Sequence, residues 1–121
     1  GRVEEQEGDL SAAKLSTYRG LSLFDSLGDE LNVGLMLARL VELGAGTNED
    51  RSLLAGASAR LLASPHNADL ADTPQVRSAM ASLHGYRGRD AWHTGDALSR
   101  AQTVSRARRI VETDLSKATS D

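Results

Sequence analysis

The segment 84–93 combines side chains that bind anions with rings that suit a boundary between water and an apolar layer. It holds two arginines, two histidines, a tyrosine and the only tryptophan of the chain. Guanidinium groups offer paired donors to phosphate or carboxylate oxygens, and the rings of tyrosine and tryptophan are apolar with one polar end. Gly85 and Gly88 allow positive φ and the close approach of a ligand. We predict an exposed loop that contacts an anionic ligand through His84, Tyr86, Arg87, Arg89, Trp92 and His93.

The tripeptide Tyr-Arg-Gly occurs twice, at 18–20 and at 86–88. A mainly apolar run follows the first copy, so we expect a second contact loop made of Tyr18, Arg19, Leu21, Leu23 and Phe24. Side by side at one end of a helical bundle, the two loops would form a basic tip with apolar side chains around it. Successive connections of an up-down bundle alternate between its ends. The loops can therefore share a tip only if a short helix, 74–85 or alternatively 49–63, lies across the bundle.

A structural role for the same residues is the competing interpretation. The single tryptophan of a small helical domain is usually packed. Trp92 and Tyr86 can thus close the end of a bundle, while the loop arginines pair with Asp90 or with the acidic middle of the chain. For Leu21, Leu23 and Phe24 the structural interpretation is the favoured one, because helix 21–43 continues their stripe into the core. Exposure of the rings and of the guanidinium groups decides between the two interpretations.

Enzymatic chemistry has little support in the sequence. The chain lacks the Gly-x-x-x-x-Gly-Lys phosphate loop, the Gly-x-Gly-x-x-Gly dinucleotide motif, His-Glu-x-x-His and Gly-x-Ser-x-Gly. It has no cysteine, which excludes disulfides, thiolate metal ligands and a cysteine nucleophile. His84, Asp90 and His93 can in principle reach one metal ion, but their spacing matches no familiar ligand set. We therefore expect no catalytic residue, no metal and no cofactor.

Composition favours a single all-α domain. The 121 residues are 40% hydrophobic but only 3% aromatic, so the core must consist mainly of leucine, alanine and valine. Leucine and alanine favour helices, whereas strands prefer β-branched and aromatic residues. A chain of this length forms one domain with its own core. No apolar run approaches the length of a membrane span, and no secretion leader is evident.

Apolar spacing divides the chain into an acidic lead-in and five helices. We expect residues 1–9 to be flexible and residues 10–121 to form the helical domain. The expected helices are 10–20, 21–43, 49–63, 74–85 and 96–117. Helix 21–43 is apolar on two sides, which is typical of a central helix. The expected fold is an antiparallel four-helix bundle with an additional short crossing helix.

Local signals mark most of the expected helix ends. The first helix is expected to end or bend at Gly20, and the second is expected to end at Gly44-Ala45-Gly46. Thr47, with Asp50 three residues later, predicts a capping box at the start of the third helix. Pro74 is expected in the first turn of the fourth.

Charge is unevenly distributed along the chain. Residues 21–76 hold three arginines against eight acids, whereas residues 77–109 hold seven arginines against two acids. Such an asymmetric field orients a protein on a charged partner even though the net charge is only −3. The arginines of the last helix spread around its axis, which is typical of a solvated face and argues against a nucleic-acid recognition helix. A membrane suits the loops better, because anionic lipids contribute about 1 kcal/mol per nearby Lys or Arg and the rings can enter the headgroup layer.

The two Tyr-Arg-Gly segments and the Ala/Leu/Arg-rich helices resemble a known family over roughly residues 10–118. This family comprises the N-terminal lipid-raft-targeting domains of BteA-type effectors of the Bordetella type III secretion system. It is similar to the four-helix-bundle membrane-localisation domains of large bacterial toxins. The resemblance implies tip loops, made of the residues named above, that bind host membrane containing phosphatidylinositol 4,5-bisphosphate. One departure is that such tips often use lysine, whereas Lys14 is the only lysine near this one.

The same resemblance implies partners and a location. A cognate type III secretion chaperone would bind the N-terminal region in the bacterial cytoplasm, and the secreted protein would reach lipid rafts at the cytoplasmic face of the host plasma membrane. No nucleic-acid partner is implied, and homodimerisation stays open. The main alternative to this non-enzymatic targeting domain is a protein-binding helical adaptor or chaperone-docking domain, in which the loop residues meet a protein partner. Nucleic-acid binding through the last helix is a third alternative.

Overall fold

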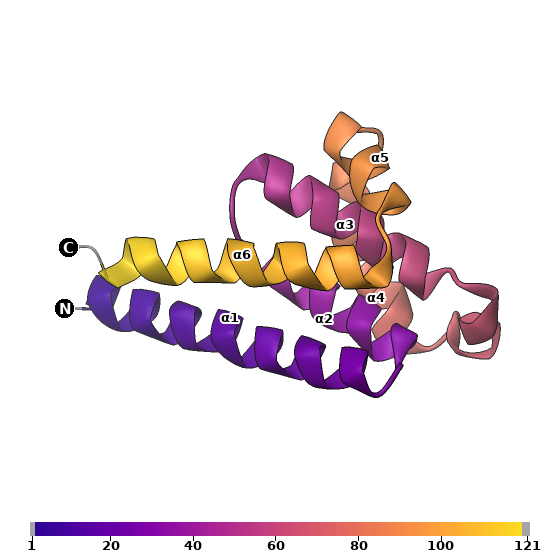
Figure 1. Cartoon of the computed structure of the whole chain (residues 1–121), viewed down its shortest axis with the longest axis horizontal. Helices are drawn as coiled ribbons and strands as arrows, with labels where there is room; N and C mark the ends of the chain where they lie inside the picture. The colour runs from indigo at the N-terminus through magenta and orange to yellow at the C-terminus, as the bar shows by residue number, and fades with distance from the viewer. Residues whose placement is uncertain (1, 120–121) are drawn as a thin grey trace.

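The chain is helical throughout the part that its structure describes. The computed structural model describes the backbone of residues 2–119 and the side chains of residues 8–117, and no strand occurs within this range (Figure 1). The all-α expectation is therefore confirmed. The elements are α1 (Arg2–Ser26), α2 (Glu30–Glu42), α3 (Asn48–Leu62), the 3-10 helix η1 (Pro65–Leu70), α4 (Pro74–Leu83), the 3-10 helix η2 (His84–Tyr86), α5 (Asp90–Ala97) and α6 (Arg100–Thr119).

The first helix begins earlier in the chain than its apolar spacing indicates. α1 starts at Arg2, so residues 2–9, expected as a separate lead-in, lie within its bounds. Gly1 lies outside the described residues, as do the side chains of residues 2–7. The flexibility of the lead-in stays a prediction.

The expected helix end at Gly20 is wrong, because α1 continues through the first Tyr-Arg-Gly copy to Ser26. A Cβ atom at Gly20 would lie 3.4 Å from Sδ of Met36 in α2, so this glycine lies where the two helices meet. The chain turns instead at Gly28, whose φ of 71° belongs to the left-handed region that glycine adopts at little cost. Asp29 then caps α2, because its side chain accepts a hydrogen bond from the backbone N–H of Asn32.

The boundaries between α2, α3 and α4 confirm the local signals in the sequence. Gly44 and Gly46 have φ values of 75° and 70° after the end of α2. Thr47 and Asp50 form the predicted capping box, with each side chain accepting a hydrogen bond from the other residue's backbone N–H. Pro74 occupies the first turn of α4 as expected. Such ends are predictable because their geometry depends on a few neighbouring residues.

α3 is the central helix, in place of the expected helix 21–43. Every residue of α3 from Ser52 to Ala59 is buried, and the helix packs against α2, α4, α5 and α6. Small side chains make this possible, because they let several helices approach the same backbone. The hydroxyl of Ser58, for example, donates a 2.6 Å hydrogen bond to the carbonyl oxygen of Gly34 in α2. The expected stripe of helix 21–43 fails at Leu27, which is 69% exposed.

α5 lies across α3 at a backbone-to-backbone contact made by two glycines. A Cβ atom at Gly56 of α3 would overlap the carbonyl oxygen of Trp92, and one at Gly95 of α5 would overlap the carbonyl oxygen of Leu53. α5 was not predicted from the sequence, and it occupies part of the expected 84–93 loop and the residues after it. Its eight residues carry no apolar stripe long enough to recognise.

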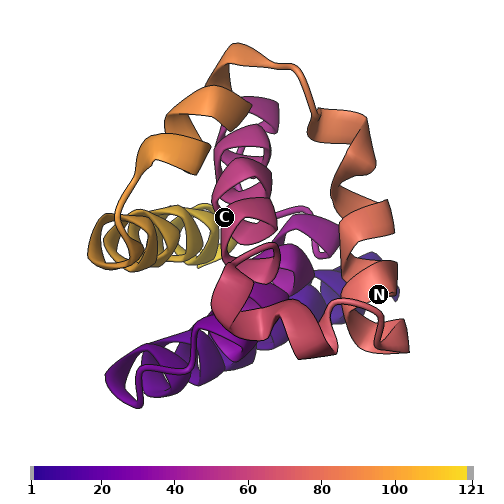
Figure 2. The ribbon, with the colours of Figure 1, turned by 90° about the vertical axis from the view of Figure 1, so that its right-hand side faces the viewer.

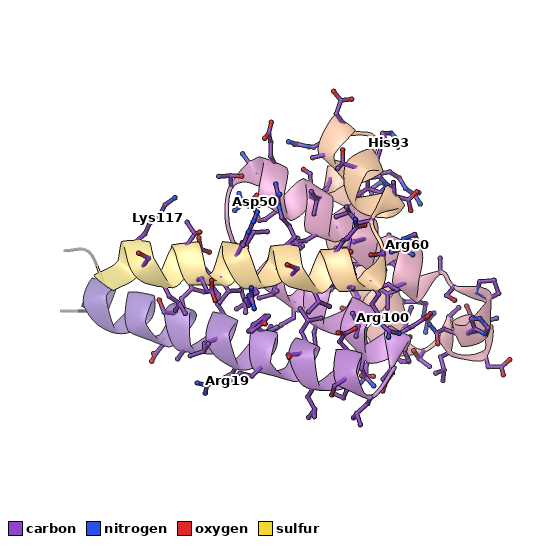
Figure 3. All side chains as sticks on the ribbon, viewed as in Figure 1. Arg19, Asp50, Arg60, His93, Arg100 and Lys117 are labelled. Atoms are coloured by element: carbon purple, nitrogen blue, oxygen red, sulfur yellow. The ribbon has the colours of Figure 1, made fainter. Side chains whose placement is uncertain are left out.

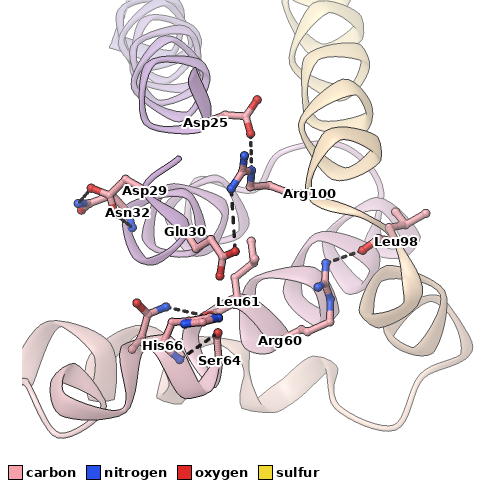
Figure 4. A network of polar contacts seen from close by, with 11 residues as sticks. Asp25, Asp29, Glu30, Asn32, Arg60, Leu61, Ser64, His66, Leu98 and Arg100 are labelled. Carbon is pink, nitrogen blue, oxygen red and sulfur yellow. Dashed lines mark hydrogen bonds and ion pairs between the residues drawn. The ribbon is translucent and has the colours of Figure 1, made fainter. Parts of the chain in front are cut away.

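α1 and α6 form a long antiparallel pair, with the start of α1 and the end of α6 at the same end of the molecule (Figure 1). Lys14 and Asp114 join the two helices through a 3.0 Å ion pair. Nearer the other end, Nε of Arg100 lies 2.7 Å from Oδ1 of Asp25, and its guanidinium also reaches Glu30 of α2 at 4.0 Å (Figure 4). The pair is thus fixed at two separate points.

Not every other helix runs along this pair as a simple bundle requires. α4 stands steeply across the directions of α1 and α6, whereas α3 is inclined to them (Figures 1 and 2). The buried stripe of α6 passes through Thr103, Ala107, Ile110 and Val111, whereas Ala101 is exposed. A helical domain is therefore established, and the antiparallel four-helix arrangement is not.

Candidate functional site

The segment 84–93 folds as η2, a turn and the first residues of α5. Gly88 takes a φ of 87°, which makes the turn between the two helices, whereas Gly85 does not have positive φ. η2 packs against α3 and α4, and α5 packs against α3. The predicted contact residues thus lie on two short helices packed against the central helix and on the turn between them, which carries Arg87 and Arg89. We refer to the surface made by His84, Tyr86, Arg87, Arg89, Trp92 and His93 as the loop surface.

The two arginines of the loop surface are exposed, and each lies over an aromatic ring. Cζ of Arg87 is 5.9 Å from the ring centroid of Trp92, and Cζ of Arg89 is 5.9 Å from that of Tyr86. Within the described part of the chain, neither guanidinium forms a hydrogen bond or an ion pair. The alternative in which they pair with Asp90 or the acidic middle of the chain is therefore wrong. Stacking orients each guanidinium and leaves its N–H donors available to an anion.

The rings of the loop surface are consistent with both roles considered in the sequence analysis, contact with a ligand and packing in the fold. Tyr86 and Trp92 are half-buried and pack against the hydrophobic core, so a structural role is part of what they do. His84 and His93 are exposed. Only the outer parts of the two rings are left for a partner, and deep insertion of Trp92 would require it to leave its packing.

A hollow of about 440 Å³ adjoins Arg87 between α4 and the loop surface. Met80, Ala81 and the ring of Trp92 form apolar walls, while His84 and Arg87 supply polar donors. A group with anionic oxygens and an apolar part matches this lining. The hollow contains no pairing of a nucleophile with a general base, so its lining suits binding more than bond breaking.

The residues of the first Tyr-Arg-Gly segment do not join the loop surface. They lie on the continuous helix α1, where Leu21 is fully buried, Tyr18 and Phe24 are half-buried, and Arg19 and Leu23 are exposed. Figure 3 shows Arg19 and His93 on opposite sides of the molecule. The expected shared tip is therefore wrong. Its physical cause is the unbroken helix at Gly20, which makes the first segment part of a helix face.

The arginines of α6 differ in what they contact. Arg100 pairs with Asp25 and Glu30, and Nε of Arg108 lies 3.8 Å from Oε1 of Glu112. Arg106 and Arg109 are exposed and form no ion pair or hydrogen bond with other described residues. Both line hollows between α6 and the α3–α5 pair. All four arginines of α6 are expected from the sequence to lie on one solvated face. The only sequence signal that Arg106 and Arg109 lie on the same side of the helix is their i, i+3 spacing.

Within the described residues, neither a metal-binding cluster nor a membrane-spanning helix is found. No group of three or more His, Asp or Glu side chains there is arranged to hold a metal ion, so His84, Asp90 and His93 do not converge on one. None of the described helices combines the length and the apolar character needed to cross a bilayer.

No protein-family model, curated protein or solved structure matches this chain. The resemblance to lipid-raft-targeting domains therefore stays a prediction.

Proposed function

We propose that this domain is a non-enzymatic targeting module that docks on anionic, phosphoinositide-bearing membrane through the loop surface. The observation that carries the proposal is the pair Arg87 and Arg89, which are exposed, lack acidic partners among the described residues and each lie over an aromatic ring. Arginines in this state meet an anionic surface without first breaking an ion pair. The hollow beside Arg87 gives one phosphate-bearing headgroup a place to settle.

The energetics favour a multiply charged headgroup. Each arginine near an anionic membrane contributes about 1 kcal/mol, so two contribute about 2 kcal/mol, which alone corresponds to weak binding. Asp90 is exposed beside them and reduces the local positive charge. A headgroup with several phosphates engages both guanidinium groups at once and offsets this reduction. The proposal therefore concerns lipids such as phosphatidylinositol 4,5-bisphosphate more than singly charged phosphatidylserine.

The proposal also includes the bundle topology, the location and the chaperone partner that the resemblance implies. An antiparallel four-helix bundle with a short crossing helix is supported in part by the α1–α6 pair. Secretion into a host cell, docking at lipid rafts on the cytoplasmic face of its plasma membrane, and a cognate secretion chaperone would follow from that family. Arg19 and Leu23 form a separate exposed patch on α1, so the proposal assigns membrane contact to the loop surface alone.

Liposome co-sedimentation tests the proposal. Wild-type protein should pellet with phosphatidylcholine vesicles that contain phosphatidylinositol 4,5-bisphosphate, and less with phosphatidylserine vesicles of equal total charge. R87E/R89E should weaken binding by at least about tenfold, because the change removes two attractive charges and adds two repulsive ones. Binding should also fall as ionic strength rises.

The matched control is R39E/R108E, which makes the same change in net charge at two exposed arginines away from the loop surface. Its pelleting should stay close to that of the wild type. Equal pelleting of R87E/R89E and wild type would refute the proposal. A wild type that ignores all vesicles but binds a protein partner through Arg87 and Arg89 would support the adaptor alternative.

A further inference from the structure

A second surface lies along α6, on the side that faces α3 and α5. Three hollows of about 290 to 480 Å³ adjoin one another there. Arg106 lines all three, and Asp50, Leu53, Thr94 and Arg109 each line two. Shared lining means that the hollows are neighbours on one face of the molecule, and we call the surface they make together the α6 trough.

The α6 trough is long enough for a peptide segment. Its lining on α6 extends from Ala101 to Lys117. At 1.5 Å per residue of helix, this stretch is about 24 Å long. Figure 3 shows Asp50 on the α3 side of the trough and Lys117 toward its end on α6.

The walls of the α6 trough carry opposite charges over an apolar floor. Leu53, Leu98 and Ile110 contribute to the floor. On the α6 wall, Arg106 and Arg109 are exposed and without an ion-pair or hydrogen-bond partner in the described part of the chain, whereas Asp114 on the same wall is paired with Lys14 of α1. The facing wall holds the acids Glu49, Asp50 and Asp90.

This charge pattern selects one class of occupant. An anionic membrane or a nucleic acid would be attracted by Arg106 and Arg109 but repelled by the acids on the other wall. A protein segment can satisfy both walls, with acidic residues over α6, basic residues over α3 and α5, and apolar residues on the floor. Within the described residues there is no sheet edge to pair with an extended backbone. A helix, which satisfies its own backbone hydrogen bonds, is the form that fits.

We propose that the α6 trough binds an amphipathic helix of a partner protein, with an acidic flank seated on Arg106 and Arg109. This inference is independent of the proposed membrane contact, because its arginines, Arg106 and Arg109, lie on α6 and do not belong to the loop surface. It assigns the domain a protein-binding surface in addition to the loop surface.

A designed peptide tests this assignment directly. The probe is a fluorescent helical peptide of about 16 residues, matching the trough, with a leucine stripe, glutamates along one flank and lysines along the other. Fluorescence anisotropy should show saturable binding to the wild-type protein. R106E/R109E should weaken binding by about tenfold or more, because two attractive charge pairs become repulsive.

Two controls separate charge recognition from general adhesion. R108E changes an exposed arginine on the same helix that pairs with Glu112 and lines none of the three hollows, so it should bind the peptide like the wild type. A second peptide, with lysines on both flanks, should prefer R106E/R109E to the wild type. Circular dichroism checks that the variants keep the helical content of the wild type.

Several outcomes would overturn the proposal. These are no saturable binding to the wild type, equal affinity of the wild type and R106E/R109E, or the same loss of affinity in R108E. Loss of vesicle pelleting in R106E/R109E without any change in peptide binding would assign the trough to a membrane surface instead.

Discussion

At the scale of single residues, Asp114 connects segments that are distant in the sequence. Its Oδ2 atom lies 3.0 Å from Nζ of Lys14 in α1 and accepts a 2.8 Å hydrogen bond from the backbone N–H of Gly46, in the loop between α2 and α3. The Lys14 and Asp114 side chains are only 12% and 14% exposed. One carboxylate therefore joins three segments at a place where water cannot easily replace it.

Replacing Asp114 by alanine should lower the free energy of unfolding by about 2–3 kcal/mol. The substitution leaves an almost buried ammonium group and a backbone N–H without their partner, and such unpaired groups cost more than the original pair contributes. Urea denaturation at neutral pH, followed through Trp92 fluorescence, measures the change. Glu112→Ala, on the same helix but in an exposed pair, should change stability by less than about 0.5 kcal/mol.

A double-mutant cycle sharpens this prediction. Lys14→Met combined with Asp114→Ala removes both charges, so the double variant should be less destabilised than the sum of the two single variants. Strict additivity would contradict the structural account of this pair.

The exposure of individual residues could be predicted only where it did not depend on whether a helix continues through the segment. Arg87 and Arg89 are exposed as the charge pattern indicated. Leu21 was expected in a contact loop and is instead fully buried. Because α1 is continuous, Leu21 lies one turn after the buried Thr17 on the same helix face. If the helix ended at Gly20, Leu21 would not lie on the same face as Thr17. One misplaced helix boundary therefore led to the wrong assignment of the first Tyr-Arg-Gly segment.

Among the elements, α5 depends most on glycine. Gly56 and Gly95 bring its backbone against that of α3, and any Cβ atom at either position overlaps a carbonyl oxygen of the other helix. α5 holds Trp92 of the loop surface and Thr94 of the α6 trough. The crossing of α3 and α5 therefore positions parts of both candidate sites.

Gly95→Ala should destabilise the domain by about 1–3 kcal/mol, the usual cost of overpacking. Alanine normally stabilises a helix interior by about 1 kcal/mol relative to glycine. A decrease in the stability of Gly95→Ala would therefore be opposite to the change that helix propensity predicts. Thermal unfolding by circular dichroism measures the effect, and Trp92 emission should change because the tryptophan backbone borders the contact. Gly85→Ala is the matched control, because a Cβ atom there has nothing within 4 Å, and should be nearly neutral. A neutral or stabilised Gly95→Ala would mean that α3 and α5 do not cross this closely.

The same crossing explains why α5 was not found in the sequence. Helices are recognised by an apolar stripe or by capping residues, and α3 and α4 have such signals in Thr47, Asp50 and Pro74. α5 is only eight residues long, and the side chain of Arg89 at its N-cap forms no capping hydrogen bond. α5 packs against α3 because glycine has no side chain at positions 56 and 95. A glycine contributes nothing to an apolar pattern, so this contact cannot be predicted from hydrophobic spacing.

For the whole molecule, composition predicted the class of fold but not its arrangement. Many leucines and alanines with few aromatics dictate helices, and helices are what forms. Which faces meet depends on pairs of residues distant in sequence, such as Gly56 with Trp92 or Lys14 with Asp114. No local pattern encodes these pairs. The expected shared tip failed for this reason, since it required a particular packing of helices in addition to correct helices.

The two candidate surfaces should act independently although α5 borders both. η2 packs against α3 and α4, whereas α6 packs against α1 and α3, so the two surfaces share only α3 among these neighbours. At physiological ionic strength the Debye length is about 8 Å, so charges on separate exposed surfaces interact little. R87E/R89E should therefore change the affinity for the amphipathic peptide by less than about twofold, and R106E/R109E should change vesicle pelleting by less than about twofold. Measuring both variants in both assays checks this. If each double variant instead weakened both ligands strongly, the loop surface and the α6 trough would be parts of one site, and α5 would be the element that couples them.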